Sequence, residues 1–235
     1  MKIAVAFFGI PRNSPICFPS IEQNVLAQLP AGSDVKCFYH LYKIDEVQNS
    51  RSGEKGELAA DNYQPFESMT GTLTSTEGVL ERWDFEQVKA QGDTWADDFA
   101  SLRNLILQLN SLHTVTSMIE PFNPDFVVFV RPDNFFHSAL PGYIFAHPEV
   151  RKHNTYIPDW QWWGGLNDRF AICGRDTYVA YGKRIERIFD FCKATGRKLH
   201  SERLLKYALQ QVDAKICTLP TQASRVRITG AFAEE

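Results

Sequence analysis

The sequence predicts an α/β protein with a mostly parallel central sheet flanked by helices. Phe126 to Val130 is an unbroken apolar run that includes three valines, which is typical of a strand buried on both faces of such a sheet. Asp97 to Glu120 places leucine, isoleucine and valine at the spacing of one helical face, and Pro121 ends that helix. Lys2 to Phe8 is a hydrophobic run. A Gly/Pro loop follows it, and then a helix is expected over Pro19–Leu29, so the chain opens with a β-loop-α unit.

The region between the first helix and the long helix predicts one strand and much irregular chain. Val35 to Leu41 follows a Gly-Ser-Asp turn and is expected to be the second strand. Lys43 to Gly78 is polar and rich in turn residues, so we expect a long loop there, and long loops in compact domains are usually functional or mobile. Val79 to Ala90 predicts a short helix.

The C-terminal half continues the alternation of strands and helices. Leu140 to Glu149 carries two prolines and predicts a loop. Ser201 is expected to cap the helix that it begins. The other elements expected here are strands at Asn154–Ile157, Phe170–Cys173, Lys215–Leu219 and Arg225–Ile228, and helices at Asp176–Lys193 and Ser201–Gln211. The sequence contains no repeat, low-complexity tract or linker, so we expect one domain over residues 1–235.

The composition argues against several classes of function. Of 235 residues, 44% are hydrophobic and 23% charged, and the formal net charge is −3, so no global positive field attracts nucleic acid or an anionic membrane. We expect no nucleic-acid partner. The amino-terminal apolar run is too short for a signal segment or a membrane span, so no integral membrane segment is expected. The cysteines are odd in number, widely spaced and without a CxxC pair, which predicts reduced thiols in a cytoplasmic protein.

The end of the Phe126–Val130 strand brings three kinds of polar side chain together. Arg131, Pro132, Asp133 and Asn134 follow it, and proline ends the hydrogen-bond ladder of a strand. Ligands of open α/β sheets bind at the carboxyl ends of the strands. A cation, a carboxylate and an amide at this edge could hold a phosphate-bearing ligand, directly or through a metal ion. The alternative is an ordinary turn, because proline, aspartate and asparagine are all turn residues.

Other strand ends and the long helix carry further candidates. Gly9 lets a ligand approach the backbone after the first strand, and Arg12 offers a guanidinium group suited to phosphate. The loop is not the GxGxxG dinucleotide fingerprint, and a plain strand-to-helix connection is the alternative. His40 ends the second strand, where it could stack on a nucleotide base, although a lone histidine there is more often structural. Some polar side chains of the long helix could border a ligand groove, although solvent is their usual destination; these are Arg103, Asn104, Gln108, Asn110 and His113.

Three of the five tryptophans lie within four residues, just before two consecutive glycines. Trp162 and Trp163 precede Gly164 and Gly165. Flat indole rings beside flexible glycines can form the wall of a sugar site, because the C–H faces of a pyranose pack on aromatic surfaces. The alternative is that the indoles fill a core or an interface. Consecutive tryptophans in a glycine-rich turn cannot all face one side, which favours binding of an acceptor sugar.

Several short motifs together resemble a known family. FFGIPRN, the strand end HLY, VVFVRPDNFF after a long helix, and LNDRFAI before a helix occur in this order. They resemble a GT-A-type glycosyltransferase of the bacterial or viral groups whose central motif is R-x-D rather than D-x-D. The similarity extends from Lys2 to about Leu209. It implies a single GT-A-like (Rossmann-like) domain that transfers a sugar from a nucleotide-sugar donor to a carbohydrate acceptor.

The resemblance also implies roles for individual residues. The central aspartate of such enzymes binds a divalent ion that bridges the donor diphosphate, and Asp133 matches it. Arg131 stands in place of the usual first aspartate, so its guanidinium group could instead neutralise the diphosphate directly, with Asn134 assisting. Mn²⁺ or Mg²⁺ held by one carboxylate and substrate oxygens is chemically reasonable as well. The candidates for donor binding are Phe8, Gly9, Arg12, His40, Arg103, Arg131, Asp133 and Asn134.

The tryptophan segment has its own resemblance. Trp163–Gly165 followed by Asp168 is similar to the WGG-acidic segment of β-galactosyltransferase-type enzymes, in which glycines flank the two sugars and an acidic residue is the base. Leu166–Asn167 departs from its acidic run, so only Asp168 can take that role. We expect an inverting transfer in which a carboxylate accepts the proton of the acceptor hydroxyl. Asp168 is the first candidate for this base and Glu202 is the second. The alternative role of Glu202 is to complement the helix dipole. A retaining mechanism is also compatible with the sequence.

Two other classes of function stay open. A nucleotidyltransferase would use a similar sheet, but usually has a phosphate loop rich in Gly, Arg and Lys, whereas GIPRNS supplies one glycine and one arginine. A non-catalytic carbohydrate-binding module would explain the tryptophans, but would not need the RPDN strand end.

Overall fold

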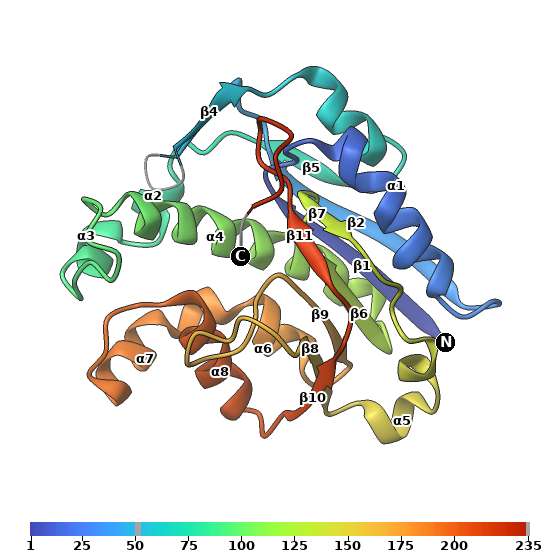
Figure 1. Ribbon diagram of the computed structural model, residues 1–235. Helices are drawn as coiled ribbons and strands as arrows, with labels where there is room; N and C mark the ends of the chain where they lie inside the picture. Colours follow the sequence, from blue (N-terminus) through green and yellow to red (C-terminus); the bar gives the residue numbers. More distant parts are fainter. Residues whose placement is uncertain (50–52, 234–235) are drawn as a thin grey trace.

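The computed structural model describes residues 1–49 and 53–233. Within these ranges the centre is a seven-stranded sheet in the order β5-β2-β1-β6-β9-β8-β10 (Figure 1). The pairs β1–β2, β1–β6, β2–β5 and β8–β10 are parallel, and β9 is antiparallel to both of its neighbours. The strands are β1 (Lys2–Gly9), β2 (Asp34–Tyr42), β5 (Thr70–Thr74), β6 (Phe126–Val130), β8 (Asn154–Pro158), β9 (Phe170–Gly174) and β10 (Lys215–Leu219). The predicted α/β class with a mostly parallel sheet is confirmed.

Helices cover both faces of this sheet. On β1, Ile3, Val5 and Phe7 join a core with α1, whereas Ala4 and Phe8 join a core with α4, α6 and α8 on the opposite face. Because both faces are covered, β6 and β9 are buried along their whole length, which explains their unbroken apolar sequences. The helices are α1 (Ser14–Asn24), α2 (Val79–Arg82), α3 (Phe85–Lys89), α4 (Ala100–Ile119), α5 (Pro148–Arg151), α6 (Tyr178–Gly182), α7 (Ile188–Thr195) and α8 (Ser201–Gln210). Among them, none combines the length and apolar character that crossing a membrane requires.

Two small antiparallel sheets accompany the large one. β3 (Glu46–Asn49) pairs with β4 (Glu54–Glu57), and β7 (Asn134–Phe136) pairs with β11 (Ala223–Arg225). Since β7 begins four residues after β6 ends, β11 brings the C-terminal segment to the carboxyl end of β6 (Figure 1).

The segment predicted as a long loop, Lys43–Gly78, is largely regular, so that prediction is wrong. It contains the β3–β4 hairpin, a 3₁₀ helix η3 (Ala60–Phe66) and β5. β5 pairs with β2 at the edge of the sheet, and most of its residues are exposed. An exposed edge strand does not need the apolar run that marks an inner strand, so composition did not reveal it. Residues 50–52 of the predicted loop lie outside the described part of the chain.

Several element boundaries also differ from the predictions. The first helix begins at Ser14 and ends at Asn24, with a 3₁₀ turn η1 (Leu26–Gln28) after it. The predicted helix Val79–Ala90 is divided into α2 and α3 at Asp84, whose side chain accepts a hydrogen bond from the amide of Gln87. The last strand ends at Arg225 rather than continuing to Ile228.

The predicted helix Asp176–Lys193 is divided into α6, a 3₁₀ turn η6 (Arg184–Arg187) and α7. Gly182 ends α6, and a Cβ atom there would lie 2.0 Å from Oγ1 of Thr116 on α4, so the two helices pack closely at this boundary. The expected loop Leu140–Glu149 includes a 3₁₀ turn η5 (Gly142–Phe145) and the start of α5.

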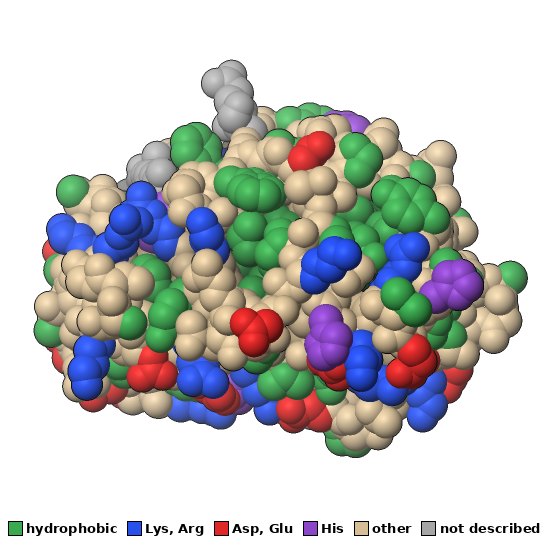
Figure 2. Space-filling view, turned by 90° about the horizontal axis from the view of Figure 1, so that it is seen from below, with side chains coloured by type: hydrophobic (Ala, Val, Ile, Leu, Met, Phe, Trp, Pro, Cys, Tyr) green, Lys and Arg blue, Asp and Glu red, His purple; other side chains and the backbone are tan. Residues whose placement is uncertain are grey.

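A hollow lined by apolar side chains opens on the face that carries α8 and β10 (Figure 2). Its volume is about 250 Å³, and Trp162, Leu166, Leu209 and Ile216 contribute to its lining. Trp162 and Leu166 belong to the tryptophan segment, so one predicted acceptor residue borders a cavity.

Candidate functional site

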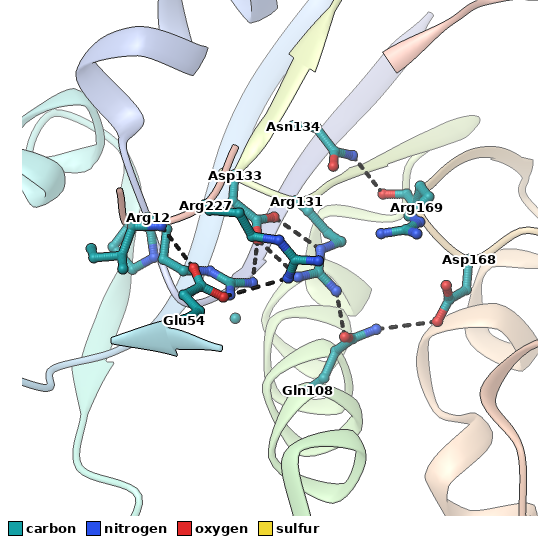
Figure 3. A network of polar contacts seen from close by, with 12 residues as sticks. Arg12, Glu54, Gln108, Arg131, Asp133, Asn134, Asp168, Arg169 and Arg227 are labelled. Carbon is teal, nitrogen blue, oxygen red and sulfur yellow. Dashed lines mark hydrogen bonds and ion pairs between the residues drawn. The ribbon is translucent and has the colours of Figure 1, made fainter. Parts of the chain in front are cut away.

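The polar residues that follow β1 and β6 meet at the carboxyl edge of the sheet (Figure 3). Gly9 turns the chain with a φ of 101°, a conformation that glycine adopts without strain. Three residues later the Arg12 side chain reaches Asp133, with 2.5 Å between Nη2 and Oδ2. The two strand ends predicted to share a ligand site are therefore in direct contact.

Asp133 is fully buried and two guanidinium groups hold its carboxylate. Arg131 donates from Nε to Oδ1 over 3.0 Å and from Nη2 to Oδ2 over 2.9 Å, which is a bidentate pair. Burial by itself raises the pKa of this carboxyl group, but the positive charges of Arg131 and Arg12 hold the pKa of Asp133 far below its ordinary value. Asp133 is therefore ionised, and it fixes both arginines at the end of the sheet.

This arrangement does not fit a divalent cation at Asp133. Both of its oxygens already accept hydrogen bonds from guanidinium groups, and a cation placed beside them would meet like charges at short range. Within the described ranges, no group of three or more His, Cys, Asp or Glu side chains could hold a metal ion. The positive charge at this place comes instead from Arg12 and Arg131.

A second buried carboxylate, Glu54 of β4, lies beside Arg12. Its Oε2 accepts from Nη1 of Arg12 over 2.9 Å and from Nη1 of Arg227 over 3.5 Å. Its Oε1 accepts from the backbone amide of Ile228 over 2.7 Å. The C-terminal segment after β11 thus joins the same network as the loops after β1 and β6 (Figure 3).

Among the described residues of this region, guanidinium groups outnumber carboxylates. Burial and the neighbouring charges of Arg169 and Arg131 lower the pKa of Arg225 to about 9, so Arg225 is still a cation at neutral pH. The described carboxylates Asp133 and Glu54 lie among the guanidinium groups of an arginine cluster, which consists of Arg12, Arg131, Arg225 and Arg227. These guanidinium groups are suited to an anionic ligand.

Gln108 of α4 connects this cluster to Asp168. Its side-chain oxygen accepts from Nη1 of Arg131 over 2.5 Å, and its side-chain nitrogen donates to Oδ2 of Asp168 over 3.2 Å (Figure 3). The amide has one correct orientation here, because a guanidinium group only donates and a carboxylate only accepts. A predicted donor-binding residue and the predicted base are thereby joined by a single side chain.

Asp168 is 7% exposed, and its side-chain contacts with the described residues are made by Oδ2. Ser201 donates its hydroxyl to that oxygen, and Nη2 of the fully buried Arg184 lies 3.7 Å from it. Burial alone raises the pKa of Asp168, but Arg184 and the Ser201 hydrogen bond bring it below its ordinary value. Among the described residues Oδ1 has no hydrogen-bond partner.

The prediction that Ser201 caps α8 is wrong. His200 is the N-cap residue of that helix, and no side chain makes the capping hydrogen bond. Ser201 is instead the first helical residue and its hydroxyl binds Asp168. Oε2 of Glu202, the second candidate base, lies 2.9 Å from Nδ1 of His200. Its described contacts do not connect it to the Arg131–Gln108–Asp168 chain.

The tryptophan segment is anchored to the start of α8. The backbone amide of Leu166 donates to the carbonyl of Glu202 over 3.0 Å. A Cβ atom on Gly165 would lie 2.1 Å from that same carbonyl group, so only glycine fits there. Gly164 has a φ of 78°, which turns the chain beside it.

Its two predicted acceptor tryptophans differ in exposure. Trp163 is 62% exposed, whereas Trp162 is 36% exposed and donates its indole N–H to the carbonyl of Pro158 over 2.6 Å. Asp168 follows five residues after Trp163 in the same segment, so an acceptor bound at this surface would be carried by the chain that also holds the candidate base. None of the described cavity-lining residues beside Trp162 belongs to the arginine cluster.

Asn134 supports the site rather than facing a ligand. It is 1% exposed and its side-chain amide donates to the backbone carbonyl of Arg169 over 2.9 Å. This hydrogen bond holds the loop that carries Asp168 against the start of β7.

Two other predicted donor-binding residues are buried in the core, and a third lies outside the network. His40 is 2% exposed, and Ser111 and Thr74 occupy its two ring nitrogens at 2.9 and 3.1 Å. Burial lowers its pKa to about 4, so it is a neutral core residue between β2, β5 and α4. The Phe8 side chain is 1% exposed in the core. Arg103 is exposed on α4 and none of its described contacts belongs to the network.

The structure adds four residues that the sequence did not single out: Glu54, Arg184, Arg225 and Arg227. It also selects Gln108 from the polar residues of the long helix, among which the sequence could not choose. The positions of Arg225 and Arg227 in a predicted strand were a usable signal, because residues two apart on a strand share a face. Glu54 carried no such signal, since it lies among many polar neighbours in the sequence.

Comparisons with known proteins give little beyond the fold class. No protein-family model matches the sequence, and no curated protein matches it. Among solved structures, the chain is similar to the crystal structure of mouse xyloside xylosyltransferase 1 in its apo form. The identity is 8%, the TM-score is 0.48, and the alignment covers 93% of this chain and 85% of that one. The central sheet with one antiparallel strand and helices on both faces is a Rossmann-like α/β arrangement, as the sequence predicts. The case for a function therefore depends on the site itself.

Proposed function

We propose that the protein is a glycosyltransferase that moves a sugar from a nucleotide-diphosphate sugar to a hydroxyl group of a carbohydrate acceptor. The observation that carries this proposal is the chain of contacts from Arg12 through Asp133, Arg131 and Gln108 to Asp168. It joins a cationic cluster to a carboxylate with a free oxygen. Both lie where ligands of α/β sheets bind.

The cationic cluster has the charge that the departing group needs. When the bond between the anomeric carbon and the diphosphate oxygen breaks, its electron pair stays on the diphosphate and negative charge develops there. Fixed guanidinium groups stabilise such charge without reorganising, and removal of one comparable donor typically lowers kcat by about 10²–10³-fold. Arg12 and Arg131 are fixed in this way by Asp133.

Asp168 is the carboxylate that we assign to the acceptor. The acceptor oxygen forms a bond to the anomeric carbon, and its proton passes to Oδ1 of Asp168. Since Gln108, Ser201 and Arg184 all contact Oδ2, the proton-accepting oxygen is left free while the carboxylate is held in place. This geometry supports an inverting transfer, with Glu202 as the second candidate for the base.

The tryptophan segment is our candidate for acceptor binding. Trp163 offers a large exposed indole surface, and Gly164 and Gly165 set the backbone path that leads to Asp168. A pyranose ring stacked on the indole would present a hydroxyl group to this part of the chain. The single-domain organisation and the cytoplasmic location stay predictions from the sequence.

The proposal is tested by incubating the protein with a panel of nucleotide-sugars, with and without Mn²⁺. Slow release of nucleoside diphosphate, lowered in Asp168→Asn, is the expected result. Release of pyrophosphate from a sugar phosphate and a nucleoside triphosphate would identify a nucleotidyltransferase instead. Carbohydrate binding without either reaction would identify a binding module. Either outcome would contradict sugar transfer.

A further inference from the structure

Glu54 is a buried carboxylate held by the same kinds of donor that bind phosphate oxygens. Its side chain is 1% exposed. Two guanidinium groups, from Arg12 and Arg227, and the backbone amide of Ile228 surround it at 2.9, 3.5 and 2.7 Å. Guanidinium forks and backbone N–H groups form the strong, charge-assisted hydrogen bonds of phosphate sites. The carboxylate of Glu54 therefore stands where an anionic ligand group would find its donors.

The element that carries Glu54 is separate from the sheet that carries Arg12. β4 pairs with β3 in a two-stranded sheet of its own, whereas Arg12 follows β1 at the centre of the large sheet. A two-stranded hairpin is only marginally stable by itself. Contacts such as that of Glu54 with Arg12 and Ile228 consequently hold the hairpin in place, and a competing anion can replace them without disturbing the central sheet.

The charge of Glu54 also balances part of the positive charge of the arginine cluster. Without it, Arg12 would keep Asp133 as a partner, whereas Arg227 would lose the carboxylate that it contacts, and buried charge without a partner is strongly unfavourable. Even with Glu54 present, burial and the charges of neighbouring guanidinium groups lower the pKa of Arg225. The Nε atoms of Arg12 and Arg225 are buried and have no hydrogen-bond partner among the described residues, so these N–H groups are donors that a larger anion could use.

We propose that Glu54 occupies the place of a donor phosphate group in the ligand-free protein, and that a nucleoside diphosphate binds by displacing it from Arg12, Arg227 and the amide of Ile228 without a divalent cation. The nature of the anion rests on the proposed function. The anion site itself rests on the contacts of Glu54. Because part of the binding free energy is used to break these contacts, Glu54 lowers the apparent affinity of the site.

The test is calorimetric titration of the protein with several nucleoside diphosphates and with inorganic pyrophosphate, in buffer that contains EDTA. Glu54→Gln removes the competing charge and is expected to bind these anions about tenfold more tightly than the wild type. Glu57→Gln, which removes the same charge from an exposed position on the same hairpin, is expected to bind like the wild type. Unchanged or weaker binding by Glu54→Gln, or binding that requires Mn²⁺, overturns the proposal.

A second variant covers the case in which Glu54→Gln does not fold. Arg227→Gln removes one donor of the site and is expected to weaken binding of the same anions about tenfold. Wild-type affinity in this variant also overturns the proposal.

The outcomes separate this inference from the proposed function. Tighter pyrophosphate binding by Glu54→Gln, with no nucleoside diphosphate released from any nucleotide-sugar, supports the anion site and contradicts sugar transfer. Sugar transfer with equal affinities in Glu54→Gln and wild type supports the function and contradicts the role of Glu54.

Discussion

Arg131 and Asp168 bind opposite ends of one side-chain amide, that of Gln108. Arg131 lies at the end of a central strand and Asp168 in the loop that leads into β9, so the amide couples two regions that the chain order keeps apart. If the protein transfers sugars, this contact sets the distance between the charge that stabilises the leaving group and the carboxylate that accepts the proton.

Gln108→Ala tests the importance of this coupling. A hydrogen bond to a charged group contributes about 1.5–3 kcal/mol, so we expect kcat to fall about tenfold or more. The KM for the donor should change less, because Asp133 still holds Arg131. Steady-state kinetics with a responsive nucleotide-sugar measures both constants. Asn104→Ala, at an exposed position of the same helix, is the control; equal kinetics of the two variants would show that the bridge has no catalytic role.

Asp168→Asn tests the proposed base. The variant keeps the size and most of the hydrogen-bonding capacity of the side chain but cannot accept the proton. We expect turnover to fall about 10²-fold or more, while donor affinity measured by calorimetry stays nearly unchanged. A variant with full turnover would show that Asp168 is not the base. Glu202→Gln would then be the next variant to measure.

Ser201→Ala tests how the surroundings of Asp168 set the pH dependence of activity. The Ser201 hydroxyl helps to hold the pKa of Asp168 below its ordinary value, so wild-type activity should persist as pH falls to the ordinary aspartate range of about 4. Without that hydrogen bond the pKa rises, and the acidic limb of the profile should move to higher pH. The profile of kcat/KM shows the shift. An unmoved acidic limb would mean that another group limits the rate.

His40 should affect the stability of the fold rather than nucleotide binding. Burial lowers its folded-state pKa from 6.5 to about 4. The stabilisation is therefore fully present above pH 6.5 and is lost as pH falls from 6.5 towards 4, by up to about 3 kcal/mol. In urea titrations at several pH values, His40→Gln should show a weaker loss across this window than the wild type.

The exposed His147→Asn should keep the wild-type dependence and serves as the control. If His40→Gln instead lost nucleotide affinity at unchanged stability, the histidine would have the ligand role that its place at a strand end predicted.

Gly165→Ala should destabilise the protein and displace the tryptophan segment. The new methyl group would lie 2.1 Å from the backbone carbonyl of Glu202, and backbone cannot yield as a flexible side chain can. We expect a loss of about 1–3 kcal/mol in the free energy of unfolding, measured by chemical denaturation. At Gly142 the same methyl group would meet nothing closer than 3.9 Å, so Gly142→Ala should stay close to wild type. Equal stabilities would contradict the close packing of this segment on α8.

Local patterns predicted the inner strands, the long helix and the polar strand end after β6 well. An unbroken apolar run such as Phe126–Val130 has one common explanation, burial on both faces of a sheet, and it is buried throughout. The exposed edge strand β5 lacked such a run and was read as a loop. His40 lies near the end of β2 and was therefore predicted to bind a nucleotide base. The sequence does not reveal that Ser111 and Thr74 contact both of its ring nitrogens.

Hydrophobic spacing and turn chemistry act over a few neighbouring residues, so the order of amino acids alone predicts which segments form a central sheet and which charged residues follow its strands. Which of those charges meet depends on how the whole chain folds. Arg12 and Asp133 are 121 positions apart and Gln108 and Asp168 are 60 apart. Contacts at such separations arise from the packing of the whole chain, so the roles of Glu54 and Gln108 emerged only from the folded molecule.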